Sequence, residues 1–210
     1  MFSAFFRIIL ILVTMNGILI SHASAQTATS ILLFGDSIIA GYGLAQENAL
    51  SARLEAFFNE KGRDVKVING GVSGDTTTSA RGRLKWTLDK YKPDVVFLAL
   101  GGNDVLRGFS PTVTRDNLDA MLTICKKRNI KVVLSAVRAP ANLGLEYMGS
   151  FNKIYPDLAD KYNAPLYPFL LEKTFGNQTL MQSDGIHPTA EGVKSIANEL
   201  GPYLLKNILK

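Results

Sequence analysis

The sequence predicts an α/β domain built on a parallel, doubly wound sheet. Short, continuously apolar runs recur along the chain, which is the pattern of strands that are buried on both faces. Amphipathic stretches with helical spacing separate these runs. No internal repeat and no linker divides the 210 residues, of which 47% are hydrophobic and 20% are charged. Since strands that alternate with helices pair in parallel, one domain of this class accounts for the whole pattern.

Five apolar runs are expected to form the strands. They lie at residues 31–34, 65–68, 95–100, 132–137 and 166–167. The first run leads directly into Gly35, which allows a sharp turn because it has no Cβ. The third run is the most apolar and ends in Gly101-Gly102-Asn103-Asp104. Among the common orders for such sheets, the flavodoxin-like order 2-1-3-4-5 suits five strands best.

The segments between the strands have the period of helices. We expect helices at about 48–61, 78–90, 113–128 and 146–161, and a last helix from Thr189 onward. Gly62 is a suitable stop for the first helix, and Thr189 is a suitable N-cap for the last one. Pro156 is expected to break the fourth helix, and Gly201-Pro202 should bend or interrupt the last one.

Residues 1–25 have the pattern of a signal peptide. Arg7 precedes the apolar stretch Ile8–Ile20, and Ala23-Ser24-Ala25 fits a cleavage site. A retained N-terminal anchor is the alternative, although the stretch is short for a membrane span. Cleavage after Ala25 would leave a domain at residues 26–210 that is periplasmic or secreted.

Composition restricts the partners and cofactors. The net charge of +5 is mild and no long basic run occurs, so we expect no nucleic acid binding and at most weak contact with a membrane surface. Cys125, the only cysteine, follows apolar residues at helical spacing and is expected to be a buried thiol. The sequence offers neither a usual metal ligand set nor a dinucleotide-binding glycine motif, so we expect no metal and no cofactor. The oligomeric state is left open, with a monomer favoured.

Ser37 is the candidate nucleophile. It follows Gly35 and Asp36 at the carboxyl end of the first strand, the edge at which open α/β sheets bind ligands. A serine hydroxyl needs a base, and His187 is the only histidine outside the signal peptide. Asp184 lies three residues before His187, within reach of the imidazole Nδ1–H across a tight turn. The alternatives are an ordinary Gly-Asp-Ser turn and a structural histidine.

Three groups are candidate donors to an oxyanion. They are the backbone N–H groups of Ser37 and Gly74 and the side-chain amide of Asn103. Gly74 and Asn103 lie in the loops that follow the second and third strands. The order 2-1-3-4-5 places these loops on either side of the first strand. Each residue alone is compatible with a plain turn, but their convergence on Ser37 favours an oxyanion hole.

Four motifs resemble, in order and spacing, the sequence blocks of the SGNH, or GDSL, hydrolase family. They are Gly35-Asp36-Ser37, Ser73-Gly74-Asp75-Thr76, Gly101-Gly102-Asn103-Asp104 and Asp184-Gly185-Ile186-His187-Pro188. The chain is most similar to small secreted bacterial arylesterases of the thioesterase I/lysophospholipase type. Gly41-Tyr42-Gly43-Leu44 and Leu106-Arg107-Gly108 add to this likeness.

The resemblance implies a fold, an activity and a set of roles. The fold would be a flavodoxin-like three-layer α/β/α sandwich. Ser37 would be the nucleophile, His187 the base and Asp184 its orienting partner, while Ser37, Gly74 and Asn103 would form the oxyanion hole. The loop 138–147 lies where such enzymes shape the substrate pocket.

The expected function is that of a serine esterase that forms an acyl-enzyme on Ser37. Aryl esters and short-to-medium acyl esters are the expected substrates, with lysophospholipids and thioesters as further candidates. One alternative is acyl transfer or deacetylation on a glycan with the same triad. A second alternative is a non-catalytic flavodoxin-like module that binds an anion, which would leave Asp184 and His187 without a role.

Overall fold

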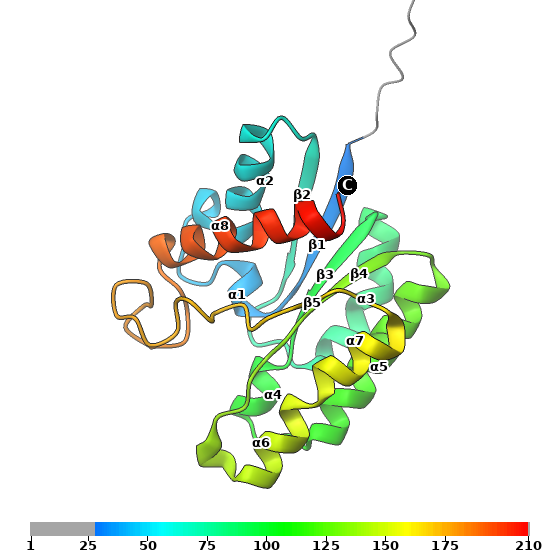
Figure 1. Cartoon of the computed structure of the whole chain (residues 1–210), viewed down its shortest axis with the longest axis vertical. Coiled ribbons are helices and arrows are strands. Elements are labelled where there is room, and N and C mark those ends of the chain that lie inside the picture. The colour runs from blue at the N-terminus through cyan, green and yellow to red at the C-terminus, as the bar shows by residue number, and fades with distance from the viewer. Residues whose placement is uncertain (1–27, 210) are drawn as a thin grey trace, which may run out of the picture.

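A computed structural model describes residues 28–209 (Figure 1). Its five strands pair in parallel in the order β2-β1-β3-β4-β5, which confirms the predicted order. The strands are β1 (Thr29–Gly35), β2 (Val65–Gly71), β3 (Val95–Ala99), β4 (Lys131–Ser135) and β5 (Leu166–Tyr167). The predicted signal peptide lies outside the described residues.

The central strands are covered on both faces, as their apolar runs predicted. Alternate residues of a strand point to opposite faces. Ile31 and Leu33 of β1 accordingly belong to one hydrophobic cluster, and Leu32 and Phe34 belong to another. All four side chains are fully buried. Two separate cores, one on each side of a single sheet, therefore hold the molecule together.

Helices form the outer two layers, which completes the α/β/α sandwich (Figure 1). One face carries α2 (Leu50–Glu60) and α8 (Ala190–Asn207). The other face carries α3 (Thr77–Tyr91), α5 (Pro111–Lys127), α6 (Leu145–Asn152) and α7 (Ile154–Tyr162). None of the helices within residues 28–209 is long and apolar enough to cross a membrane.

Four short elements were not predicted, and two of them lie at the carboxyl edge of the sheet. They are α1 (Ser37–Ala40), α4 (Gly102–Leu106) and the 3₁₀ turns at Gln46–Asn48 and Ala141–Leu143. Helices of one turn are too short to show a hydrophobic period, so the pattern that identifies longer helices does not reveal them.

The predicted break in the fourth helix occurs three residues before Pro156. Helix α6 ends at Asn152 and α7 begins at Ile154. Pro156 has no N–H to donate to the carbonyl of Asn152, so a continuous helix would lose that hydrogen bond. In the first turn of α7 the missing N–H costs nothing, because helix N-termini leave these donors without intrahelical acceptors.

The expected interruption at Gly201-Pro202 does not occur, because α8 continues to Asn207. Gly201 is buried against α2, and a Cβ there would lie 2.5 Å from ring carbons of Phe57. Its small size therefore serves helix packing. Pro202 has no N–H to donate to the carbonyl of Asn198, four residues earlier. Both residues are exposed, so this carbonyl can accept a hydrogen bond from water instead.

Two glycine substitutions test this packing. Gly201→Ala should lower the free energy of unfolding by about 1–3 kcal/mol, because the new methyl group overpacks the contact between α8 and α2. Gly82→Ala in α3 is the matched control, since no heavy atom lies within 4 Å of its Cβ position. This change should raise stability by roughly 0.5–1 kcal/mol through helix propensity. Denaturant unfolding measures both, and equal stabilisation by the two changes would contradict the close packing.

Candidate active site

The sequence around Ser37 folds into a sharp turn from strand to helix. Asp36 caps α1, since its Oδ1 accepts a hydrogen bond from the Ile38 N–H at 3.1 Å. A Cβ on Gly35 would overlap the Ile39 side chain and lie 2.6 Å from the Ala99 carbonyl oxygen. Only glycine therefore allows the chain to turn this closely. The turn places Ser37 at the first position of α1, directly above the end of β1.

The three predicted triad residues lie together. Ser37 Oγ lies 2.8 Å from His187 Nε2, and His187 Nδ1 lies 2.6 Å from Asp184 Oδ2. The other carboxylate oxygen of Asp184 accepts hydrogen bonds from the backbone N–H groups of Ile186 at 2.9 Å and His187 at 3.0 Å. With Nδ1–H donated to Asp184, Nε2 has a free lone pair that faces the serine hydroxyl.

Asp184 and Asp36 have opposite pKa shifts although the charge of the same imidazole acts on both. The hydrogen bond from His187 and the backbone N–H groups lower the pKa of Asp184 to about 2. Burial raises the pKa of Asp36 to about 6, against the opposing effects of the Ile38 N–H and of His187. The hydrogen bonds thus hold Asp184 as a carboxylate at neutral pH.

Two backbone N–H groups beside Ser37 have no protein acceptor among residues 28–209. One is that of Ser37 itself and the other is that of Gly74. Gly74 has a φ of +83°, which favours glycine, and the Arg107 guanidinium donates to its carbonyl oxygen at 3.0 Å. The arrangement leaves both N–H groups available to an oxygen of a ligand.

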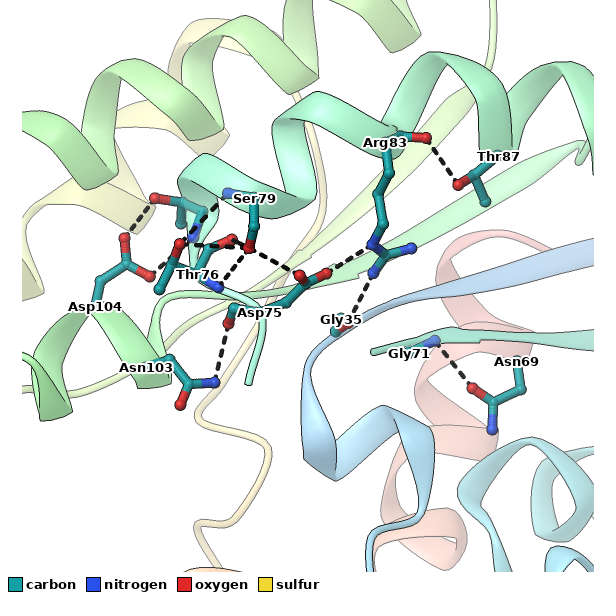
Figure 2. A network of polar contacts seen from close by, with 11 residues as sticks. Gly35, Asn69, Gly71, Asp75, Thr76, Ser79, Arg83, Thr87, Asn103 and Asp104 are labelled. Atoms are coloured by element: carbon teal, nitrogen blue, oxygen red, sulfur yellow. Dashed lines mark hydrogen bonds and ion pairs between the residues drawn. The ribbon is translucent and has the colours of Figure 1, made fainter. Parts of the chain in front are cut away.

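Asn103 lies in α4, above the end of β3. Its Nδ2 donates to the carbonyl oxygen of Asp75 at 2.9 Å, as Figure 2 shows. One amide proton is thus used to orient the side chain, and the second is available to a ligand. Gly101 precedes α4 with a φ of +120°, and a Cβ there would overlap the hydroxyl of Tyr155.

Polar residues around the buried Asp75 connect these loops to the end of β1 (Figure 2). Arg83 forms an ion pair with Asp75 at 2.6 Å and also donates to the Gly35 carbonyl oxygen at 3.1 Å. Ser79 Oγ donates to the same Asp75 carboxylate at 2.8 Å. Sequence reasoning missed this network, because a charged residue within a helix gives no sign of its partners.

Most of the predicted site residues line one cavity of about 870 Å³. Its lining includes Ser37, Gly74, Asn103 and His187. The remaining wall is largely apolar and comes mainly from the segments after β4 and β5. These lining residues are Ala136, Val137, Ala139, Pro140, Phe169, Leu170, Leu171 and Phe175. Of the loop 138–147, only its first three residues line the cavity, and the segment after β5 was not anticipated.

The described residues hold no cluster of three or more histidine, cysteine, aspartate or glutamate side chains that could bind a metal. Cys125 is buried, as its spacing predicted, and burial raises the pKa of its thiol to about 11. This thiol is far from a reactive thiolate at neutral pH.

Known proteins match the fold and most of the chain. Residues 33–194 match the GDSL-like Lipase/Acylhydrolase family. The arylesterase of Vibrio mimicus is 39% identical, with 89% of this chain and 93% of that protein covered. The thioesterase 1/protease 1/lysophospholipase L1 of Escherichia coli K12 is 38% identical, with 86% and 85% covered.

A solved structure agrees with these relatives. The crystal structure of the psychrotrophic esterase EstA from Pseudoalteromonas, inhibited by monoethylphosphonate, is 31% identical to this chain and has a TM-score of 0.82. The match covers 87% of this chain and 100% of that one. The fold, the sequence relatives and the family match agree, and the chain belongs to the GDSL-like lipase/acylhydrolase family, the SGNH hydrolases.

Proposed function

We propose that the protein hydrolyses carboxylic esters through an acyl-enzyme intermediate on Ser37. The continuous set of hydrogen bonds from Asp184 through His187 to Ser37, at the wall of an apolar cavity, carries the proposal. Membership in a family of lipases and acylhydrolases supports the class of reaction. A non-catalytic anion-binding module would have no use for a serine hydroxyl paired with an imidazole.

The reaction follows from the geometry. His187 Nε2 takes the hydroxyl proton of Ser37 as Oγ attacks the ester carbonyl carbon, and the carbonyl electron pair moves to oxygen. The N–H groups of Ser37 and Gly74 and the amide of Asn103 donate to this oxyanion. Imidazolium then protonates the leaving alcohol. Water repeats the sequence on the acyl-enzyme, with His187 again as base, and releases the acid.

Aryl esters and short-to-medium acyl esters are the proposed substrates. The apolar cavity wall suits an acyl chain that extends from Ser37 along the ends of β3, β4 and β5. Relatives named as an arylesterase and as a thioesterase and lysophospholipase support this choice, with thioesters and lysophospholipids as further candidates. Transfer to an alcohol instead of water would use the same residues.

The proposal includes the compartment. The basic start, apolar stretch and small-residue cleavage pattern of residues 1–25 are typical of a signal peptide. We infer that the mature enzyme begins at Gln26 and acts in the periplasm or outside the cell.

Ser37→Ala tests the nucleophile. Turnover of an aryl ester such as p-nitrophenyl butyrate should fall by about 10⁴- to 10⁶-fold, because no other group can form the acyl-enzyme. An organophosphonate should label the wild type and fail to label the variant. Ser150→Ala, an exposed position in α6, is the matched control and should behave as wild type. Retention of a tenth of the turnover by Ser37→Ala would disprove the mechanism.

Asn103→Ala tests the oxyanion hole. The amide donates more strongly to the charged oxygen of the tetrahedral intermediate than to a neutral carbonyl, so its loss should mainly reduce kcat. We expect a fall in kcat of about 10²- to 10³-fold with little change in KM. Asn103→Asp should be worse, because a carboxylate repels the oxyanion. Steady-state kinetics and thermal unfolding are measured on the same samples. A variant that loses stability while its folded fraction keeps a normal kcat would contradict the role of Asn103 in the oxyanion hole.

Asp36→Asn tests the cost of the buried carboxyl group. In the unfolded chain its pKa is near 3.9, and burial raises the pKa to about 6 in the folded protein. Folding therefore becomes less favourable as pH rises between these values, by up to about 3 kcal/mol. Asparagine stays neutral and its oxygen can still accept from the Ile38 N–H. The substitution should stabilise the protein at pH 8 and change it little at pH 4. Equal effects at both pH values in denaturant unfolding would contradict the raised pKa.

A further inference from the structure

Gln182 connects the loop that follows α1 to the loop that carries His187. Its Nε2 donates to the carbonyl oxygens of Tyr42 at 2.8 Å and Pro188 at 2.9 Å. Its backbone N–H donates to the carbonyl oxygen of His187 at 2.7 Å. Tyr42 in turn donates its backbone N–H to the carbonyl oxygen of Ser37 at 3.1 Å. Together with the hydrogen bond between Ser37 and His187, these bonds form a closed circuit through Ser37, Tyr42, Gln182 and His187.

The chemistry of the amide fixes its orientation. Both partners of the Gln182 side chain are carbonyl oxygens, so its NH₂ group must face them and both of its protons are used. Gly43 makes this approach possible, because a Cβ there would lie 2.5 Å from Gln182 Oε1. Gly43 also has a φ of +73°, a backbone conformation that side chains rarely adopt.

The ring of Tyr42 lies against the imidazole of His187. Their centroids are 4.4 Å apart and the ring planes are inclined by 34°. Tyr42 is 52% exposed, whereas the His187 side chain is only 15% exposed. The aromatic ring therefore covers part of the imidazole and limits its tilt and displacement.

The base of the His187 loop is held by hydrogen bonds from Thr189 to the carbonyl oxygens of Leu180 at 2.9 Å and Thr179 at 3.1 Å, but its tip has less support. Residues 183–186 are exposed or half-exposed, and Gly185 has a φ of +68°. Asp184 fixes the ring nitrogen but lies in the same exposed turn, so it moves together with His187. The bond from Gln182 to the Tyr42 carbonyl oxygen connects this loop directly to the loop that follows Ser37 and α1.

We propose that Gln182 is a positioning residue, which holds Tyr42 against His187 and thereby sets the imidazole between Ser37 and Asp184. The inference rests on the proposed function, in which His187 is the base. Displacement of a catalytic group by about 1 Å can cost on the order of 10² in rate. Loss of the Gln182 amide should therefore reduce kcat and leave KM nearly unchanged, since Gln182 does not line the cavity in which the acyl chain is proposed to bind.

Two substitutions at Gln182 form the test. Gln182→Met keeps the approximate size of the side chain and removes both hydrogen bonds, so kcat should fall by about 10- to 10²-fold with KM changed less than about twofold. Gln182→Glu keeps the shape but points a carboxylate oxygen at two carbonyl oxygens, so its loss should be at least as large. Gln178→Met, at an exposed position four residues earlier, is the control and should retain wild-type kcat.

Tyr42 separates positioning from general stability. Tyr42→Leu should reproduce the loss of kcat seen in Gln182→Met, whereas Tyr42→Phe, which keeps the ring, should recover most of it. The rate at which an organophosphonate labels Ser37 should fall in the same variants, because it needs the same base. Thermal unfolding of each variant gives the folded fraction.

Two outcomes overturn the inference. One is a loss of activity in Gln182→Met that merely follows the folded fraction, and the other is wild-type kcat in Gln182→Glu. Either result, with Ser37→Ala inactive, removes the role of Gln182 and leaves the proposed function intact. An active Ser37→Ala variant would instead remove the proposed function itself.

Discussion

The site depends on the parallel pairing of β1 with both β2 and β3. Gly35 pairs with Gly71 on one side and with Ala99 on the other, so three strands end at the same level. The loops after them carry Ser37, Gly74 and Asn103. A register shift of two residues in either pair would move one loop by about 7 Å, well beyond hydrogen-bond distance. The sheet register therefore determines whether the proposed oxyanion donors and the proposed nucleophile meet.

The glycines at the end of β2 protect this register. A Cβ on Gly70 would lie 2.9 Å from the Leu33 carbonyl oxygen, and one on Gly71 would overlap the backbone of Ala40. Larger residues there would push β2 or α1 away from β1. The two glycines thus let β2 pair closely with β1 at the edge where the chain turns sharply into α1.

Much of the fold could be predicted from the sequence because its signals are local. Buried parallel strands such as β3 are continuous apolar runs, and α2, α3 and α5 have clear helical periods. The proximity of Ser37, Asp184 and His187 could be predicted from motifs whose spacing reflects the turns that hold them. Individual hydrogen bonds and ion pairs of side chains could not be predicted in this way. The Arg83–Asp75 pair and the Gln182–Tyr42 bond join residues with no pattern in common.

The hydrogen bond between Ser37 and His187 joins residues that are 150 positions apart. The serine begins α1, directly after the first strand of the sheet, whereas the histidine lies three residues before α8, which packs on α2 in an outer layer. A ribosome-bound chain acquires the proposed nucleophile early and the proposed base only when the segment before the last helix has emerged. Under the proposed mechanism, ester hydrolysis would therefore require a chain that has been synthesised almost to its end, because an incomplete chain would lack the base.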